Sequence, residues 1–171
     1  MIVCETQRLR LRHMTAKDAA FVLELLNEPE FIRNIGDRGV RTLEDARRYL
    51  QSGPVTGYAK SGFGLYLVEL QDDATPVGIC GLLKRDYLAD VDVGFALREQ
   101  FRGKGYALEA AQAVMRHGHE VLGLRRIVAI TAPHNHASIK LLQRLGLRFE
   151  RNLRAPDVDR DTSLFTPEGG S

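Results

Sequence analysis

The chain has 171 residues, of which 44% are hydrophobic and 27% are charged, and its formal net charge is +2. This is the composition of an ordinary globular protein, and the length suits a single domain over residues 1–171. The small net charge excludes a global field that attracts nucleic acid, and no apolar run approaches the ~20 residues that span a bilayer.

The first half of the chain predicts one strand, two helices and a pair of strands. Residues 8–13 alternate polar and apolar side chains, as a half-buried strand does. Thr15 with Asp18 fits a helix N-cap with an acidic third residue, and Pro29 ends this first helix. A second helix begins at Thr42, and residues 52–62, rich in Gly, Ser and Pro, predict a loop. Residues 63–70 and 76–84 then flank a short turn and predict a hairpin.

The second half of the chain alternates strands with helices. Residues 91–97 predict a strand, and the helix after them has apolar positions that recur about every 3.6 residues. Residues 125–131 predict a buried strand, and a helix over 135–146 has Asn135 as its cap and Gly146 as its terminating glycine. The final strands are expected at 147–151 and 162–166, with a disordered tail over 166–171. We therefore predict an α/β fold with helices packed on a mixed sheet.

The corner between the strand at 91–97 and the next helix carries the clearest functional signal. The first N–H groups of a helix have no partners within it, so together with the helix dipole they favour phosphate oxygens. Gly103 and Gly105 allow the backbone to approach such an anion, and Arg102 and Lys104 add positive charge. The run lacks the Ser or Thr of a P-loop, and Leu108 stands where a dinucleotide-binding GxGxxG needs its third glycine. A tight turn with solvated cations is the alternative interpretation.

Several motifs, in one order from residue 5 to about 150, resemble the GNAT (Gcn5-related N-acetyltransferase) superfamily and its RimJ/RimL-like branch. Residues 100–105 match the signature Gln/Arg-x-x-Gly-x-Gly/Ala, and residues 103–110 match GKGYAxEA. Residues 5–12 resemble the opening ETxRLxLR, and residues 92–95 resemble an acidic-apolar-Gly-aromatic strand. Asn135, Ser138 and the Leu-Gly at 145–146 resemble the N-x-x-S motif and the Leu-Gly that follows it.

The resemblance implies a mixed, mostly antiparallel central sheet of about seven strands flanked by about four helices, and acetyl-CoA as cosubstrate. Backbone amides of residues 102–107 would hold the CoA pyrophosphate. The strand before them would splay from its neighbour after a bulge and pair with pantetheine along residues 95–97. The cofactor-binding residues that the resemblance implies are Phe95, Ala96, Leu97, Arg102, Gly103, Lys104, Gly105, Tyr106, Ala107, Asn135 and Ser138.

The implied reaction is direct attack of a primary amine on the thioester in a ternary complex. An alkyl amine, with a pKa near ~10.4, must first lose a proton, and a carboxylate can assist. Asp92 is the first candidate for this base and Glu69 the second, with a structural role as the alternative for Asp92. The family often protonates the departing thiolate with a tyrosine, but Leu142 stands at that place. Ser138 is therefore the candidate, as in RimL-like relatives, although Asn135 and Ser138 also suit an ordinary helix cap.

The acceptor is expected to be a small amine or a protein N-terminus, in a pocket built by residues 15–51, the 52–62 loop and the hairpin. A non-catalytic acyl-CoA-binding or sensing domain is the alternative, and a nucleotide-binding module is a third hypothesis. The protein is expected to be a monomer or a homodimer, with neither nucleic-acid nor membrane partners.

The remaining reactive residues suggest no further chemistry. Histidines two positions apart, at 117 and 119, point to different faces of a helix, so no metal site is expected. Cys4 and Cys80 have no metal-ligand spacing and predict reduced thiols. Because Glu5 follows only a short apolar patch, no secretory signal is predicted, and a cytoplasmic location is expected. The arginines within residues 9–13, 47–48 and 125–126 predict solvated edges, and any of them could alternatively steer an acidic substrate.

Overall fold

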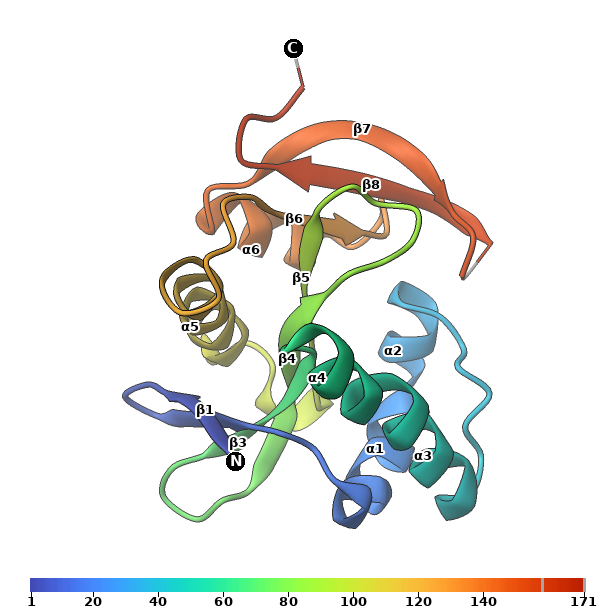
Figure 1. Ribbon diagram of the computed structural model, residues 1–171. Coiled ribbons are helices and arrows are strands. Elements are labelled where there is room, and N and C mark those ends of the chain that lie inside the picture. Colours follow the sequence, from blue (N-terminus) through green and yellow to red (C-terminus); the bar gives the residue numbers. More distant parts are fainter. Residues whose placement is uncertain (158, 171) are drawn as a thin grey trace.

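The computed structural model describes residues 1–157 and 159–170. Within these residues, eight strands form one sheet in the order β1-β2-β3-β4-β5-β6-β8-β7 (Figure 1). Neighbouring strands of this described sheet pair antiparallel, except β5 and β6, which are parallel. The strands are β1 (Ile2–Glu5), β2 (Leu9–Arg12), β3 (Leu65–Leu70), β4 (Pro76–Leu83), β5 (Val91–Leu97), β6 (Ile127–Thr131), β7 (Arg148–Ala155) and β8 (Arg160–Thr166).

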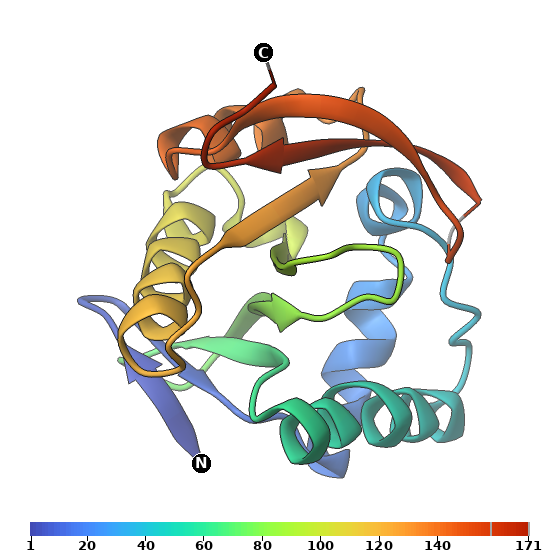
Figure 2. The ribbon, with the colours of Figure 1, turned by 45° about the horizontal axis from the view of Figure 1, so that its top comes forward.

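Helices cover both faces of the sheet. The helices α5 and α6 pack on one face, and α1 to α3 pack on the other (Figures 1 and 2). None of the helices in the described residues is long and apolar enough to cross a membrane. The helices are α1 (Ala19–Leu26), α2 (Pro29–Asn34), α3 (Leu43–Leu50), α4 (Thr56–Ser61), α5 (Tyr106–Glu120) and α6 (His136–Arg144).

Strands β3 and β4 are buried on both faces, which explains their nearly continuous apolar sequences. Successive side chains of a strand point to opposite faces. Tyr66 and Val68 therefore join the core under α5, whereas Leu67 between them joins the core under α1 and α3. In β4, Cys80 likewise joins the core under α5, and Ile79 joins the core under α1 and α3. A central strand with helices on both sides has no solvent face, so the polar half of an alternating pattern is missing.

The predicted fold class is confirmed, as are several local signals. Thr15 and Thr42 each form a capping box, with Asp18 and Asp45 respectively as the acidic third residue. The predicted hairpin is the antiparallel pair β3 and β4. The Thr15 box opens a short 3₁₀ turn that leads directly into α1.

The expectation of about seven strands and about four helices is corrected by three elements. Strand β1 is a four-residue edge strand without a clear alternating pattern. Helix α2 starts at Pro29, which we expected only to end the preceding helix; proline is well suited to the first position of a helix. The third element is α4.

The predicted loop over 52–62 is wrong. Residues Gln51–Val55 form a π turn that continues α3, and α4 follows it directly. Tyr58 of α4 stacks on His13 with ring centroids 3.9 Å apart, and its hydroxyl accepts a hydrogen bond from the Met14 N–H at 3.0 Å. This burial outweighs the low helix propensity of the Gly, Ser and Pro residues around it.

The predicted disordered tail is partly ordered. The Gly170 N–H donates to the Phe149 carbonyl at 2.9 Å, and the Gly169 N–H donates to Thr166 Oγ1 at 2.9 Å. Residues 167–170 therefore fold back toward β7, while Ser171 lies outside the described residues.

Candidate functional site

Strands β5 and β6 separate after two residue pairs. Val91 pairs with Ile127 and Asp92 with Val128, whereas β5 pairs with β4 along its whole length. Beyond Val128, β6 pairs instead with β8, so it diverges from β5 (Figure 2). The expected splay is therefore present, but the expected bulge is absent from the fully described β4–β5 ladder, whose register does not shift. The half-exposed residues 94–96 form a free edge beside the gap.

A cavity of about 380 Å³, here called the loop cavity, lies between this edge and the start of α5. Its volume is within the range of small-molecule and cofactor sites. The predicted cofactor-binding residues that line it are Phe95, Ala96, Leu97, Arg102, Gly103, Gly105, Tyr106, Ala107, Asn135 and Ser138. Lys104 is exposed and is not part of this lining, whereas Lys140 and Arg144 of α6 are part of it and were not predicted.

The turn into α5 has the geometry of an anion site. Gly103 and Gly105 have φ of 76° and 85°, a left-handed conformation that favours glycine. Gly105 is the N-cap of α5 and supplies no side chain, so no cap hydrogen bond closes the first turn of this fully described helix. The N–H groups of that turn and the dipole of a 15-residue helix therefore face the loop cavity.

Arg102 does not act as a free cation at this turn. Its guanidinium forms an ion pair with Glu28 at 2.8 Å and donates to the Leu97 carbonyl at 3.0 Å. The expectation that Arg102 adds net positive charge is therefore wrong. Its side chain instead fixes the end of β5 against the segment before α2.

Glu109, in the first turn of α5, joins this turn to the N-terminal strands. Its carboxylate accepts hydrogen bonds from the Thr6 hydroxyl, from the Arg8 N–H at 3.0 Å and from Arg8 Nε at 2.7 Å. Arg8 also donates to the Lys104 carbonyl at 3.0 Å and lies over the Tyr106 ring. Burial tends to raise the pKa of Glu109, but these hydrogen bonds hold it below its ordinary value. The sequence motifs at residues 5–12 and 103–110 therefore contact each other in the folded protein.

A second cavity of about 140 Å³, here called the strand cavity, lies on the other side of the β5 edge. Its wall comes partly from α2, from Tyr49 of α3 and from the β3–β4 hairpin, as predicted. No residue of the described segment 52–62 lines it, which corrects that part of the prediction. The residues that line both cavities are Phe31, Asn34, Ile35, Phe95, Ala96, Asn135 and Ser138.

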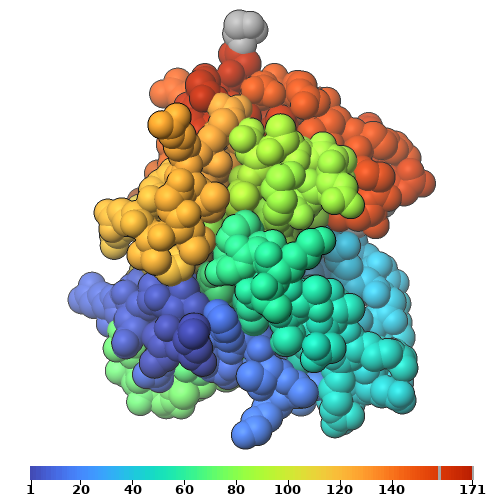
Figure 3. All heavy atoms as spheres, viewed as in Figure 1, coloured from blue at the N-terminus to red at the C-terminus, as the bar shows by residue number. Residues whose placement is uncertain are grey.

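Sequence reasoning missed the charged side of the strand cavity. Arg85 and Tyr87 come from the β4–β5 connection, and Asp157 and Arg160 come from the β7–β8 hairpin. In Figure 3, the β4–β5 connection (light green) lies between α4 (blue-green) and the β7–β8 hairpin (orange-red). No short motif joins these segments, because they meet only through the order of the sheet.

Asp92 lies in the strand cavity, where β5 and β6 begin to separate. Its side chain is 1% exposed and accepts a hydrogen bond from Arg85 Nε at 3.0 Å. Burial raises the pKa of Asp92 to about 6, and the adjacent Arg85 guanidinium opposes this shift. Arg85 also pairs with Asp157 at 2.9 Å, so Asp92 belongs to a short chain of alternating charges.

Asn135 and Ser138 lie where the two cavities meet. Asn135 Oδ1 accepts a hydrogen bond from the Ser138 N–H at 3.2 Å, which is the predicted helix cap. Both residues line both cavities, so capping the helix does not remove them from the site. Leu142, at the place where the resembled family often has a tyrosine, is only 1% exposed and packs in the core.

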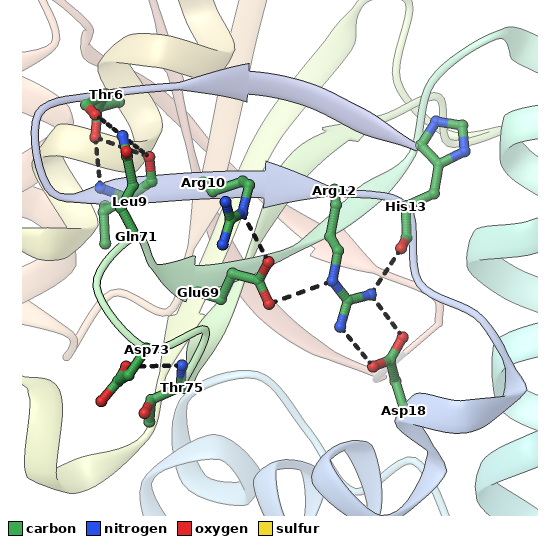
Figure 4. A network of polar contacts seen from close by, with 10 residues as sticks. All are labelled: Thr6, Leu9, Arg10, Arg12, His13, Asp18, Glu69, Gln71, Asp73 and Thr75. Carbon is green, nitrogen blue, oxygen red and sulfur yellow. Dashed lines mark hydrogen bonds and ion pairs between the residues drawn. The ribbon is translucent and has the colours of Figure 1, made fainter.

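Glu69, the second candidate base, lines neither cavity within the described residues. It is 6% exposed, and its two carboxylate oxygens accept hydrogen bonds from Arg10 Nε at 3.0 Å and Arg12 Nε at 3.3 Å (Figure 4). Arg12 also pairs with Asp18 at 2.9 Å. These contacts hold β2 against β3 and α1, so Glu69 is not available to an acceptor.

The same contacts correct part of the expectation that these arginines are solvated edges. Arg10 and Arg12 pair with carboxylates, and Arg126 pairs with Asp90 at 2.9 Å, so these three connect strands and loops. Arg47, Arg48 and Arg125 are exposed, as expected.

The histidines and cysteines form no cluster with the acidic residues. Across residues 1–157 and 159–170, no group of three His, Cys, Asp or Glu side chains has a metal-binding arrangement. Burial raises the pKa of both Cys4 and Cys80, so neither thiol ionises readily.

Comparisons with known proteins agree with this geometry. A family model described as an acetyltransferase (GNAT) domain matches residues 8–148. The uncharacterized N-acetyltransferase YnaD of Bacillus subtilis is 29% identical over 145 residues, which are 85% of this chain and 82% of that protein. A GNAT-family acetyltransferase from Bacillus anthracis superimposes with a TM-score of 0.78 at 25% identity, over 97% of both chains. RimL, the ribosomal L7/L12 alpha-N-protein acetyltransferase, solved in complex with coenzyme A, has the same fold, with a TM-score of 0.82 at 18% identity over 97% of both chains.

Replacement of Glu109 tests the contact between the N-terminal strands and the glycine turn. We expect Glu109→Gln to lower the free energy of unfolding by about 1–2 kcal/mol, because the charged hydrogen bonds from Thr6 and Arg8 become neutral ones. Urea denaturation measures this loss, and amide hydrogen exchange at residues 104–107 should become faster. Glu120→Gln, an exposed change at the other end of α5, is the control and should change stability by less than about 0.5 kcal/mol. Equal behaviour of the two variants would contradict the proposed link.

Proposed function

The chain belongs to the GNAT acetyltransferase family, and we propose that it transfers acetyl from acetyl-CoA to a primary amine where the loop cavity meets the strand cavity. The observation that carries this proposal is the position of Asn135 and Ser138 on the shared wall of the cavities. On one side of them lies the N-terminus of α5, and on the other lies the buried carboxylate of Asp92.

The loop cavity suits acetyl-CoA by its size and by its donors. The N–H groups of the glycine turn at residues 103–105 and of the first turn of α5 would hold the pyrophosphate, and Lys140 and Arg144 would add positive charge. The free edge of β5 at residues 95–97 would pair with pantetheine, as an added strand pairs with a sheet edge. The proposal is supported by the similar fold of RimL, which was solved with coenzyme A.

Acetyl-CoA supplies a thioester that an unprotonated amine can attack. In the strand cavity, Asp92 would accept the proton that the ammonium group must lose. Removal of the ammonium from water lowers the pKa of the amine, while burial raises that of Asp92 to about 6. The two values therefore approach each other, which makes the proton transfer easier. Ser138 would donate a hydrogen bond to the thiolate that leaves.

A non-catalytic acyl-CoA-binding domain is the alternative form of this proposal. It would need the loop cavity alone, whereas an enzyme also needs the strand cavity and its carboxylate. Release of free CoA from acetyl-CoA in the presence of a broad amine library distinguishes them. Binding of acetyl-CoA without turnover across that library would contradict the enzymatic proposal, and tighter binding of ATP or NAD than of CoA would contradict both.

Replacement of Asp92 tests the proposed base. We expect Asp92→Asn to lower kcat by about 10²–10⁴-fold, the usual contribution of a positioned base. Because protonated Asp92 cannot accept a proton, the kcat of the wild-type enzyme should fall as pH drops below about 6, and the Asn variant should lack this inflection. Glu69→Gln, a buried carboxylate outside both cavities, is the matched control and should keep the wild-type pH profile. An unchanged profile in Asp92→Asn would exclude this role.

Replacement of Ser138 tests the proposed donor to sulfur. We expect Ser138→Ala to lower kcat by about 10–100-fold, which corresponds to the loss of one hydrogen bond to a charged group. The KM for acetyl-CoA should change little, because the Asn135 cap bonds the backbone of residue 138 and not its hydroxyl. Steady-state kinetics with varied acetyl-CoA separate the two effects. A rise in KM at constant kcat would assign Ser138 to cofactor binding instead.

A further inference from the structure

The strand cavity contains more positive charge than its own carboxylates can match. Arg38, Arg85 and Arg160 line it, together with Asp92 and Asp157. Arg85 uses both carboxylates, at 3.0 Å from Asp92 and 2.9 Å from Asp157. The other two guanidinium groups, of Arg38 and Arg160, therefore have no carboxylate in this cavity that Arg85 does not already pair with.

Of the three arginines that line the strand cavity in the described structure, Arg38 and Arg160 have no carboxylate of their own. The nearest carboxylate oxygen to Arg38 is Asp157 Oδ2 at 3.8 Å, the same oxygen that Arg85 holds at 2.9 Å. Among the described residues, Arg160 forms no ion pair within 4.0 Å, and its one hydrogen bond is from Nη1 to the Arg33 carbonyl at 2.6 Å. Neither contact neutralises a guanidinium.

Arg160 also carries a donor that is left without an acceptor. Within the described part of the chain, its Nε is buried and has no hydrogen-bond partner. Arg38 and Arg160 line the same cavity. Burial lowers the pKa of Arg160, the like charge of Arg38 lowers it further, and Asp157 opposes this shift. An unpaired buried donor and two neighbouring cations in one cavity are a combination that a bound anion would relieve.

We propose that the acceptor is a small amino acid-like molecule, a primary amine that also carries a carboxylate. Arg38 and Arg160 bind the carboxylate, and the amine lies toward Asp92 at the edge of β5. This inference rests on the proposed function and names its substrate class. The ammonium group first gives one proton to Asp92. The amine nitrogen then bonds to the acetyl carbon as the carbon–sulfur bond breaks, and the second proton lost by the nitrogen goes to the sulfur, which leaves as the thiol of CoA.

The size and charge of the strand cavity favour a small anionic acceptor over a polyamine. A volume of about 140 Å³ suits a molecule of a few heavy atoms, since a cavity of roughly 150 Å³ holds a single benzene. A polyamine would bring several positive charges against Arg38, Arg85 and Arg160, which is repulsive. The arginines thus select against cations while they attract an anion.

Matched pairs of acceptors test this proposal directly. The pairs are glycine with glycinamide, β-alanine with β-alaninamide, and L-aspartate with L-asparagine, with spermidine as the polycation. Each compound is titrated into the CoA-loaded protein by calorimetry, and its kcat/KM is measured by CoA release. In at least one pair, we expect the more anionic member to be preferred by about tenfold or more in affinity and in kcat/KM.

Variants of the two arginines assign the preference to them. Arg38→Gln and Arg160→Gln should each reduce the preference to within about threefold, because one partner of the carboxylate is lost. Arg160→Lys keeps the charge and should retain part of the preference, which separates a loss of recognition from a loss of folding. Arg151→Gln, an exposed arginine on β7, is the control and should behave as wild type.

The outcomes separate this proposal from the proposed function. Equal use of both members of every pair, or a preference for spermidine, would overturn the acidic acceptor and leave the acetyltransferase intact. Acetylation of acidic peptides but of no amino acid would likewise overturn it. Tighter calorimetric binding of the more anionic member of a pair, without any turnover, would support the anion site and contradict the proposed function. A protein that binds none of these compounds would overturn the proposal.

Discussion

The separation of β5 from β6 is the feature on which the rest of the site depends. Two residue pairs hold these parallel strands together, and after Asp92 the partner of β6 becomes β8. The edge of β5 that is left free cannot satisfy its backbone groups within the sheet, so it can bind an extended molecule. Because β5 leads through a short 3₁₀ turn at Glu99–Phe101 into the glycine turn and α5, this free edge ends near a helix N-terminus. The separation of β5 from β6 therefore places a strand edge that is free to pair, an anion site and a buried carboxylate close together.

The charges around the site divide into those that hold the fold and those that face the cavities. Glu109 with Arg8, Glu69 with Arg10 and Arg12, and Glu28 with Arg102 connect segments that are distant in sequence. Asp92 and Arg85 form a further pair, but theirs lies in the wall of the strand cavity. Asp92 is buried beside one cation and lines an open cavity, whereas Glu69 is paired with Arg10 and Arg12 and lines neither cavity within the described residues. The geometry thus separates two buried acids, Asp92 and Glu69, that look alike in sequence.

Structural features that depend on residues close together in the sequence could be predicted from the sequence. Neighbouring residues determine the capping box at Thr15, the start of a helix at Thr42, the β3–β4 hairpin and the glycine turn, and each of these was predicted correctly. The helix α4 was missed because the half-buried ring of Tyr58, which stacks on His13, stabilises it against the low helix propensity of its sequence. Glu69 was placed on the correct strand, but the pairing of Arg10 with Glu69 across β2 and β3 decides which group it meets. Arg85, Asp157 and Arg160 could not be predicted as neighbours, because only the order of the strands brings their segments together.

We propose that the free edge of β5 and the turn into α5 bind acetyl-CoA as one continuous surface. Amide hydrogen exchange, measured with and without CoA, is the sharpest test, because both parts of the surface would bind through backbone N–H groups. We expect CoA to slow exchange at residues 95–97 and at residues 103–107 together, and we expect an equal concentration of ATP to leave residues 95–97 unprotected. Protection of the turn alone by both ligands would show instead that the site is a phosphate-binding helix end and not a cofactor groove.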